Sequence, residues 1–162
     1  MKTFAFIFLI FLICSASHGQ GNDIHCMFTE MCTPAGATTS NELKGTLRYI
    51  AKSQSMSFHY TSPKDSTITL YGNKGQAFAL RQLLISTITQ DYSSVSKRNK
   101  VETSLDDSNK TKIITITATD RFLLRYIRSV VMVYDEPSGR MKTMHLVKAD
   151  GEVSDYTFHS IE

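Results

Sequence analysis

The chain has 162 residues, of which 41% are hydrophobic and 20% are charged. These values are typical of one folded globular domain, and they argue against a disordered tail, a collagen-like repeat or a protein with several membrane spans. The formal net charge is only +3, whereas a nucleic-acid-binding domain usually carries a dense basic patch. We therefore expect no nucleic-acid partner.

Residues 1–19 have the organisation of a secretory signal peptide. One positive charge, Lys2, precedes an unbroken apolar run over residues 4–13, and small and polar residues follow up to Gly19. The run is shorter than the roughly 20 apolar residues that span a bilayer. We expect cleavage after Gly19 and a single exported domain over residues 20–162; the alternative is an uncleaved anchor helix.

The mature chain has two cysteines, Cys26 and Cys32, within one apolar segment that resembles a strand. On one strand their α-carbons would lie about 20 Å apart at roughly 3.3 Å per residue. A disulfide requires a separation below about 7 Å. Either the segment is not a strand or the pair is not bridged, and we favour two buried thiols.

Short strands dominate the expected structure. The clearest lies over residues 55–61, where Met56, Phe58 and Tyr60 alternate with polar residues, as in a half-buried strand. Turn-forming residues such as those at 63–65, 106–109 and 136–139 separate the strands, which favours an antiparallel meander in an open sheet or barrel. The expected strands cover residues 24–32, 43–51, 55–61, 66–71, 101–105, 112–119, 128–135, 140–148 and 153–161.

Two segments depart from the strand pattern. Residues 76–90 carry Phe78, Leu83 and Leu84 among apolar residues at helical spacing, which predicts a helix. It follows a turn expected at residues 72–75. Residues 120–126 are expected to form a short helical turn with Asp120 as its cap.

No motif for catalysis or metal binding stands out. The four histidines of the mature chain have no metal-ligand spacing, and no nucleophile elbow occurs. The adjacent carboxylates Asp106 and Asp107 stand in an expected turn, where aspartate is common for local hydrogen bonding. The basic stretch at 97–100 is interpreted as a solvated loop, with partner binding as the alternative. We expect no enzyme, cofactor or metal site.

Four short motifs follow one another along the mature chain. They are Phe-Thr-Glu-Met at residues 28–31, Lys-Gly-Thr-Leu-Arg-Tyr at 44–49, Met-Ser-Phe-His-Tyr-Thr-Ser-Pro at 56–63, and a closing Asp-Gly hairpin and strand at 148–161. In this order they resemble the outer-membrane lipoprotein carrier family, LolA. The resemblance covers about residues 24–162.

The resemblance implies a fold and a function. The fold would be mainly β (α+β): an open, curved antiparallel half-barrel with one or two short helices packed near its open side. The protein would be a monomeric periplasmic carrier that holds acyl chains of lipoproteins or other lipids. It would receive this cargo from an inner-membrane transporter and pass it to an outer-membrane acceptor. The apolar cavity would be lined by Phe28, Leu47, Tyr49, Met56, Phe58, Tyr60, Ile68, Leu70, Phe78, Leu83 and Leu84.

Two departures from the family pattern affect this expectation. The usual helix before the first strand is missing, because only residues 20–23 separate the expected cleavage site from Ile24. The family's gating arginine falls near Ala51 and Lys52, which makes Lys52 the candidate gating residue, although a lysine lacks the bidentate fork of an arginine. The cargo could instead be another lipid or a hydrophobic peptide. The alternative function is an exported interaction or structural module with a filled core.

Overall fold

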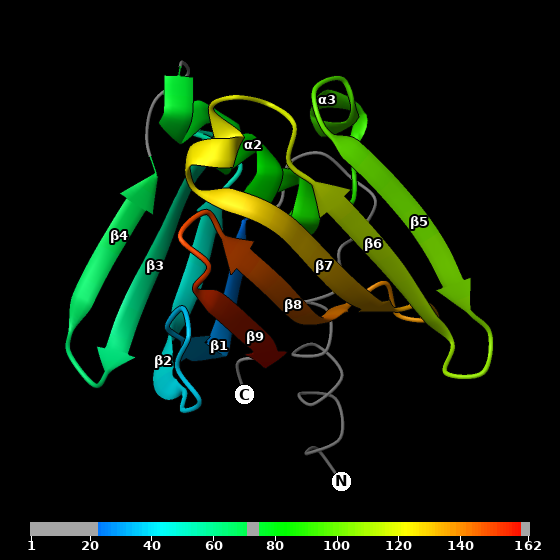
Figure 1. The fold of residues 1–162 in the computed structure, drawn as a ribbon. Helices are drawn as coiled ribbons and strands as arrows, with labels where there is room; N and C mark the ends of the chain where they lie inside the picture. Colours follow the sequence, from blue (N-terminus) through cyan, green and yellow to red (C-terminus); the bar gives the residue numbers. More distant parts are fainter. Residues whose placement is uncertain (1–22, 71–74, 160–162) are drawn as a thin grey trace, which may run out of the picture.

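The computed structural model describes residues 23–70 and 75–159, which form one antiparallel sheet with short helices (Figure 1). The first four strands are β1 (Ile24–Thr33), β2 (Asn41–Ile50), β3 (Ser55–Ser62) and β4 (Ser66–Leu70). The helices α2 (Gly75–Thr89) and α3 (Ser93–Ser96) follow. The remaining elements are β5 (Lys100–Asp106), β6 (Thr111–Thr117), the 3-10 turn η1 (Leu123–Arg125), β7 (Ile127–Asp135), β8 (Met141–Lys148) and β9 (Val153–His159).

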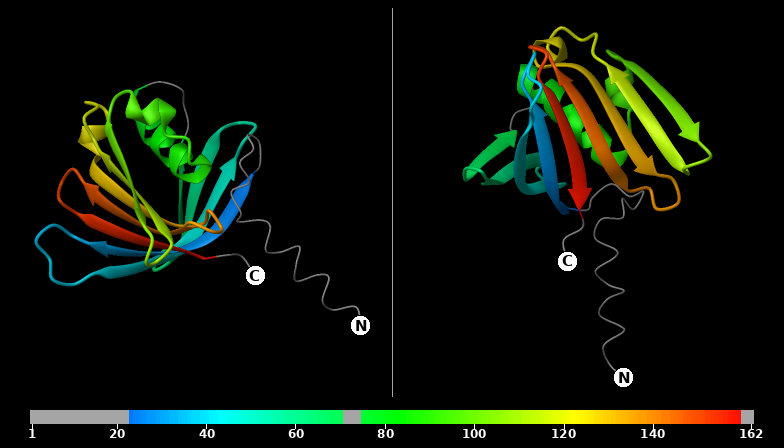
Figure 2. Two further views of the ribbon diagram at one scale, coloured as in Figure 1. Left: turned by 90° about the vertical axis from the view of Figure 1, so that its right-hand side faces the viewer. Right: turned by 60° about the horizontal axis from the view of Figure 1, so that its bottom comes forward.

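The strand order explains why a helix crosses the sheet. The order is β4-β3-β2-β1-β9-β8-β7-β6-β5, so β4 and β5 lie at opposite edges although they follow each other along the chain. The connection between them therefore has to cross one face of the sheet. It crosses on the concave face, and α2 lies in the mouth of the curved sheet (Figure 2). The expected open, curved antiparallel half-barrel with a helix near its open side is confirmed.

The boundaries of the elements agree with the sequence expectations within a few residues. The helix expected at 76–90 is α2 (Gly75–Thr89), and the strand expected at 112–119 ends at Thr117. The sequence analysis missed the single helical turn α3, which has no apolar periodicity of its own. The expected signal peptide and nearly all of the turn at 72–75 lie outside the described residues.

The two cysteines are confirmed as thiols on one strand. Cys26 and Cys32 both belong to β1, and no disulfide joins them. Cys26 is buried as expected, whereas Cys32 is half-buried. Cys32 is the last residue but one of β1.

A glycine in β2 permits close contact between the sheet and an aromatic ring. Gly45 lies opposite Phe28 on β1, at an irregularity in the pairing of β2 with β3. A Cβ at this position would collide with the backbone oxygen of His59 and would lie 2.8 Å from Cζ of Phe28. Neither the strand backbone nor a fully buried ring can move away without cost.

We expect Gly45→Ala to lower the free energy of unfolding by about 1–3 kcal/mol, the usual cost of overpacking. Without this collision, replacing glycine by alanine would stabilise the strand, since glycine is the weaker strand residue. Urea denaturation measures the free energy of unfolding of this variant and of a control, Ser57→Ala. The Ser57 side chain lies on the face of β3 that points away from Phe58 and Tyr60. A Gly45→Ala protein as stable as the parent would show that the close contact is absent.

Candidate ligand-binding concavity

The inner face of the sheet is apolar over most of its width. On β1 and β2 the more buried residues alternate with the more exposed ones, as expected for strands that send every second side chain into the concavity. On β3 only Met56 is buried, and the residues after it are half-buried or exposed. Five of the predicted cavity residues are almost fully buried there. They are Phe28 (1% exposed), Leu47 (4%), Tyr49 (6%), Met56 (1%) and, on α2, Leu83 (1%).

Toward the β4 edge, the same face is only partly covered. Phe58, Tyr60, Leu70 and Leu84 are half-buried at the margin of the core. Ile68 lies directly opposite Phe58 in the β3–β4 pairing and therefore on the same face. It is 52% exposed. The apolar wall thus continues from the packed centre to an uncovered margin at the edge of the sheet.

Aromatic rings join the packed centre to this margin. The ring of Phe28 makes edge-to-face contacts with Phe58 and Tyr60 at centroid distances of 5.9 and 5.3 Å. It also contacts Tyr156 of β9 at 5.8 Å. Edge-to-face pairs stabilise beyond their buried area. Phe28 is therefore the central side chain of the β1–β3 wall.

A buried acid, Glu30, interrupts the apolar wall, and the sequence analysis missed it. Glu30 is 2% exposed. Its two carboxyl oxygens accept hydrogen bonds from the Tyr60 hydroxyl at 2.9 Å and the Ser154 hydroxyl at 2.6 Å. The signal was available, because Glu30 stands two residues after Phe28 and shares its face of the strand. These bonds tie β1 to β3 and β9 across the concavity.

Burial also changes the acidity of the tyrosines in the concavity. It raises the pKa of Tyr60 and Tyr156 well above the ordinary value, and the negative charge of Glu30 adds to the effect. On β7 it raises the pKa of Tyr134 as well. Burial raises the pKa of Tyr92, whose hydroxyl is hydrogen-bonded to the Tyr134 hydroxyl, to about 12.

We expect stability to fall as the pH rises above about 10, the ordinary pKa of tyrosine. The unfolded chain then loses phenolic protons that the folded chain keeps, so the unfolded state is favoured. Each fully buried tyrosine contributes a slope of up to about 1.4 kcal/mol per pH unit. Urea denaturation between pH 8 and 11.5 should show a smaller slope for Tyr156→Phe than for the parent. Equal slopes in the two proteins would contradict the assignment.

Lys52, the candidate gating residue, is exposed in the turn between β2 and β3. The buried basic side chain of the concavity is instead Arg81 on α2, which is 7% exposed. Sequence reasoning missed Arg81 because its neighbours at helical spacing are apolar. It is nevertheless the one arginine in the segment that was predicted to cover the cavity.

A separate pocket of about 250 Å³ lies between α2, α3 and the segment that leads into η1. It includes Phe78 and Leu83 from the predicted set, together with Val95, Arg98, Phe122 and other residues of these elements. Its volume is below the roughly 300–1,000 Å³ of sites for drug-sized ligands. It could therefore hold one end of a ligand rather than a whole lipid.

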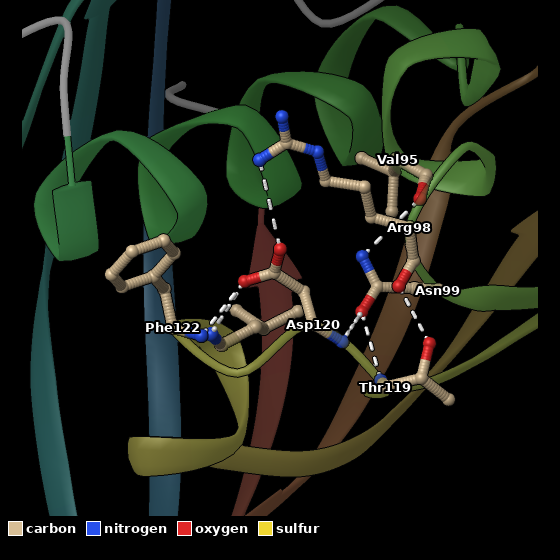
Figure 3. A network of polar contacts seen from close by, with 7 residues as sticks. Val95, Arg98, Asn99, Thr119, Asp120 and Phe122 are labelled. Atoms are coloured by element: carbon tan, nitrogen blue, oxygen red, sulfur yellow. Dashed lines mark hydrogen bonds and ion pairs between the residues drawn. The ribbon is translucent and has the colours of Figure 1, made fainter.

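Polar contacts fix the wall of this pocket (Figure 3). Asp120 accepts hydrogen bonds from the backbone N–H groups of Phe122 and Leu123 at 2.8 and 3.2 Å and so holds the turn before η1. The N-cap of η1 is Phe122, two residues later than predicted, and it makes no side-chain cap hydrogen bond. Its carboxylate also lies 3.7 Å from Arg98. The Asn99 side chain accepts from the N–H groups of Thr119 and Asp120. Part of the basic stretch at 97–100 therefore holds η1 in place.

The remaining polar motifs have local roles. Asp106 accepts hydrogen bonds from the backbone N–H groups of Ser108 and Asn109, as expected for a turn. Within residues 23–70 and 75–159, no three His, Cys, Asp or Glu side chains gather as metal ligands. None of the helices in this same part of the chain is both long and apolar enough to cross a membrane.

Comparison with known proteins gives similarity in structure but not in sequence. No family model and no curated protein matches the chain. Among solved structures, a LolA superfamily protein from Nitrosomonas europaea is 9% identical with a TM-score of 0.43, over 94% of this chain and 90% of that one. MucB is 10% identical with a TM-score of 0.44, over 95% of this chain but only 57% of MucB.

A third similar structure is a domain described as an outer membrane lipoprotein-sorting protein, from Vibrio parahaemolyticus. It is 12% identical with a TM-score of 0.38, over 88% of this chain and 85% of that domain. At such low identities and TM-scores, the function has to be inferred from the side chains of this chain.

Proposed function

We propose that the protein is an exported, non-catalytic carrier that binds acyl chains of lipoproteins or other lipids in the concavity of its sheet. The observation that carries the proposal is the uncovered part of the apolar wall. The pairs Phe58–Ile68 and Met56–Leu70 lie opposite each other on β3 and β4, and the wall runs from the fully buried Met56 to Ile68, which is 52% exposed. An acyl chain lying along this margin would continue the core of the protein.

The energetics suit reversible binding. Each methylene removed from water contributes about 0.8 kcal/mol, so a long acyl chain gains on the order of 10 kcal/mol on entering an apolar site. In this structure α2 already occupies the centre of the concavity, with Leu83 in the same core cluster as Phe28 and Leu47. Cargo would have to displace part of α2, and the cost of doing so would lower the net affinity. Such a balance permits release to an acceptor.

The place of this carrier in the cell follows from the same proposal. Cleavage of residues 1–19 would release it into the periplasm, where it would act as a monomer. An inner-membrane transporter would load it and an outer-membrane acceptor would unload it. Phe78, Leu83 and Leu84 on α2 would line the entrance, while the gating role predicted for Lys52 would require this exposed side chain to reach α2.

One observation favours the alternative, an exported interaction module with a filled core. Phe28, Leu47 and Met56 are no more than 4% exposed, so the centre of the concavity is packed by the protein's own side chains. In that case the uncovered Ile68 margin would contact a protein rather than a lipid. The two functions differ in whether acyl chains bind at all.

Binding of a long-chain lipid by the mature protein tests the proposal. Native mass spectrometry of protein purified from the periplasm should show a co-purified lipid, and fatty acids should displace an apolar fluorescent dye from it. A protein free of lipid that takes up neither dye nor fatty acid would support the interaction module and contradict the carrier.

A further inference from the structure

Arg81, which is 7% exposed, is the one buried basic residue among the described residues. It lies on α2, and its guanidinium carbon is 5.7 Å from the centre of the Phe78 ring. It is also close enough to Tyr49 for its positive charge to oppose the rise in the pKa of that phenol caused by burial. The guanidinium therefore lies beside an aromatic ring of α2 and within electrostatic range of Tyr49 on β2.

The hydrogen bonding of Arg81 is incomplete. Its Nε is buried and has no hydrogen-bond acceptor. None of the ion pairs between the described residues includes Arg81; they involve more exposed groups such as Lys44 with Glu42 and Lys142 with Asp135. A buried charge without a hydrogen-bonded partner is costly, and burial is tolerated chiefly where the charge is paired. Arg81 is thus a largely buried cation with no acidic partner in the part of the chain that the structure describes.

We propose that Arg81 binds the ionised head group, a carboxylate or phosphate, of an acyl ligand held in the concavity. This inference rests on the proposed function and narrows its cargo to acidic amphiphiles. A planar guanidinium suits the purpose because it donates two parallel hydrogen bonds to an oxyanion. Leu80 and Leu84, half-buried on the same helix, supply apolar contacts for the beginning of the chain.

An acyl chain that is esterified to another molecule has no ionised carboxylate at its end. The site would therefore discriminate between a free acid and its ester of equal length. Hydrogen bonds to charged groups are stronger than neutral ones, so we expect a preference of about tenfold to a hundredfold for the acid.

The experiment compares dodecanoate with methyl dodecanoate by dye displacement at pH 8.5. The unchanged protein should bind the acid at least tenfold more tightly. Arg81→Met should bind both with the affinity of the ester, and Arg81→Lys should keep part of the preference. Arg48→Met, on the exposed outer side of β2, is the matched control and should behave like the parent.

Urea denaturation provides a second readout. Arg81→Met should be as stable as the parent or more stable, because it removes an unpaired buried charge. A large loss of stability with an unchanged acid preference would assign Arg81 a structural role and overturn the inference. Equal binding of acid and ester by the parent would also overturn it, while leaving the carrier function intact. Binding of neither ligand would contradict the carrier function itself, and the inference with it.

A competition experiment distinguishes the head group of an amphiphile from free phosphate as the anion that Arg81 binds. Inorganic phosphate at millimolar concentration should not displace the dye, since the acyl chain supplies most of the binding. Displacement by phosphate alone would show a simple anion site and would overturn the assignment to an amphiphile.

Discussion

Phe58→Asp is expected to weaken binding of an acyl chain by about 100-fold or more while leaving the protein folded. Phe58 stands on the inner face of β3, at the margin between the packed centre and the exposed Ile68. The substitution removes apolar contact worth about 1.5–3 kcal/mol and places a carboxylate where an acyl chain would exclude water. Since 1.4 kcal/mol corresponds to a factor of ten, the two effects together exceed two orders of magnitude. Dye displacement and native mass spectrometry measure the loss.

Two further variants separate a binding defect from a folding defect. Ser57→Asp introduces the same charge one residue away, on the outer face of β3, and should bind lipid normally. Ile68→Asp should weaken binding with little loss of stability, because this side chain is 52% exposed. If Phe58→Asp unfolds the protein and Ile68→Asp binds lipid like the parent, the margin of the wall is not a binding surface.

Phe28→Ala is expected to destabilise the protein by about 3–5 kcal/mol, the usual cost of removing a fully buried aromatic ring. Phe28 is 1% exposed and touches the rings of Phe58, Tyr60 and Tyr156. Its cavity cannot close easily, because it lies between two hydrogen-bonded strands. This loss is a large part of the 5–15 kcal/mol that stabilises a typical domain, so the variant should unfold at low urea.

Phe158→Ala provides the comparison for this prediction. Phe158 lies opposite Phe28 on β9 but is only half-buried, so its loss should cost clearly less. Equal effects of the two substitutions would mean that Phe28 is not the centre of the wall. A Phe28→Ala protein as stable as the parent would show that the concavity is loosely packed around it.

Local pattern was enough to predict the strands and the side chains that share a face. The alternation of Met56, Phe58 and Tyr60 depends only on the period of a strand, and all three lie on the inner face of β3. The helix α2 was predicted in the same way, from the helical spacing of its apolar residues. The motifs at residues 28–31, 44–49 and 56–63 also indicated the open half-barrel, through the family they resemble.

Local pattern could not predict the contacts that each side chain makes with other elements of the fold. Ile68 shares a face with Phe58, yet it is 52% exposed on β4, an edge strand with a neighbouring strand on one side only. Glu30 and Arg81 resemble surface residues by type, and only the closing of the sheet around α2 buries them. The pocket between α2, α3 and η1 depends on contacts between segments far apart in the chain, which no local pattern reports.

The methionines of the chain allow the most direct test of where an acyl chain binds. Met56 lies on the inner face of β3 and is 1% exposed, whereas Met27 and Met31 on the outer face of β1 are 41% and 37% exposed. In methyl NMR spectra with a spin-labelled fatty acid, a carrier should show strong broadening of the Met56 signal and little change at Met27 and Met31. Broadening confined to Met27 and Met31, or none at any methionine at saturating ligand, would contradict binding in the concavity.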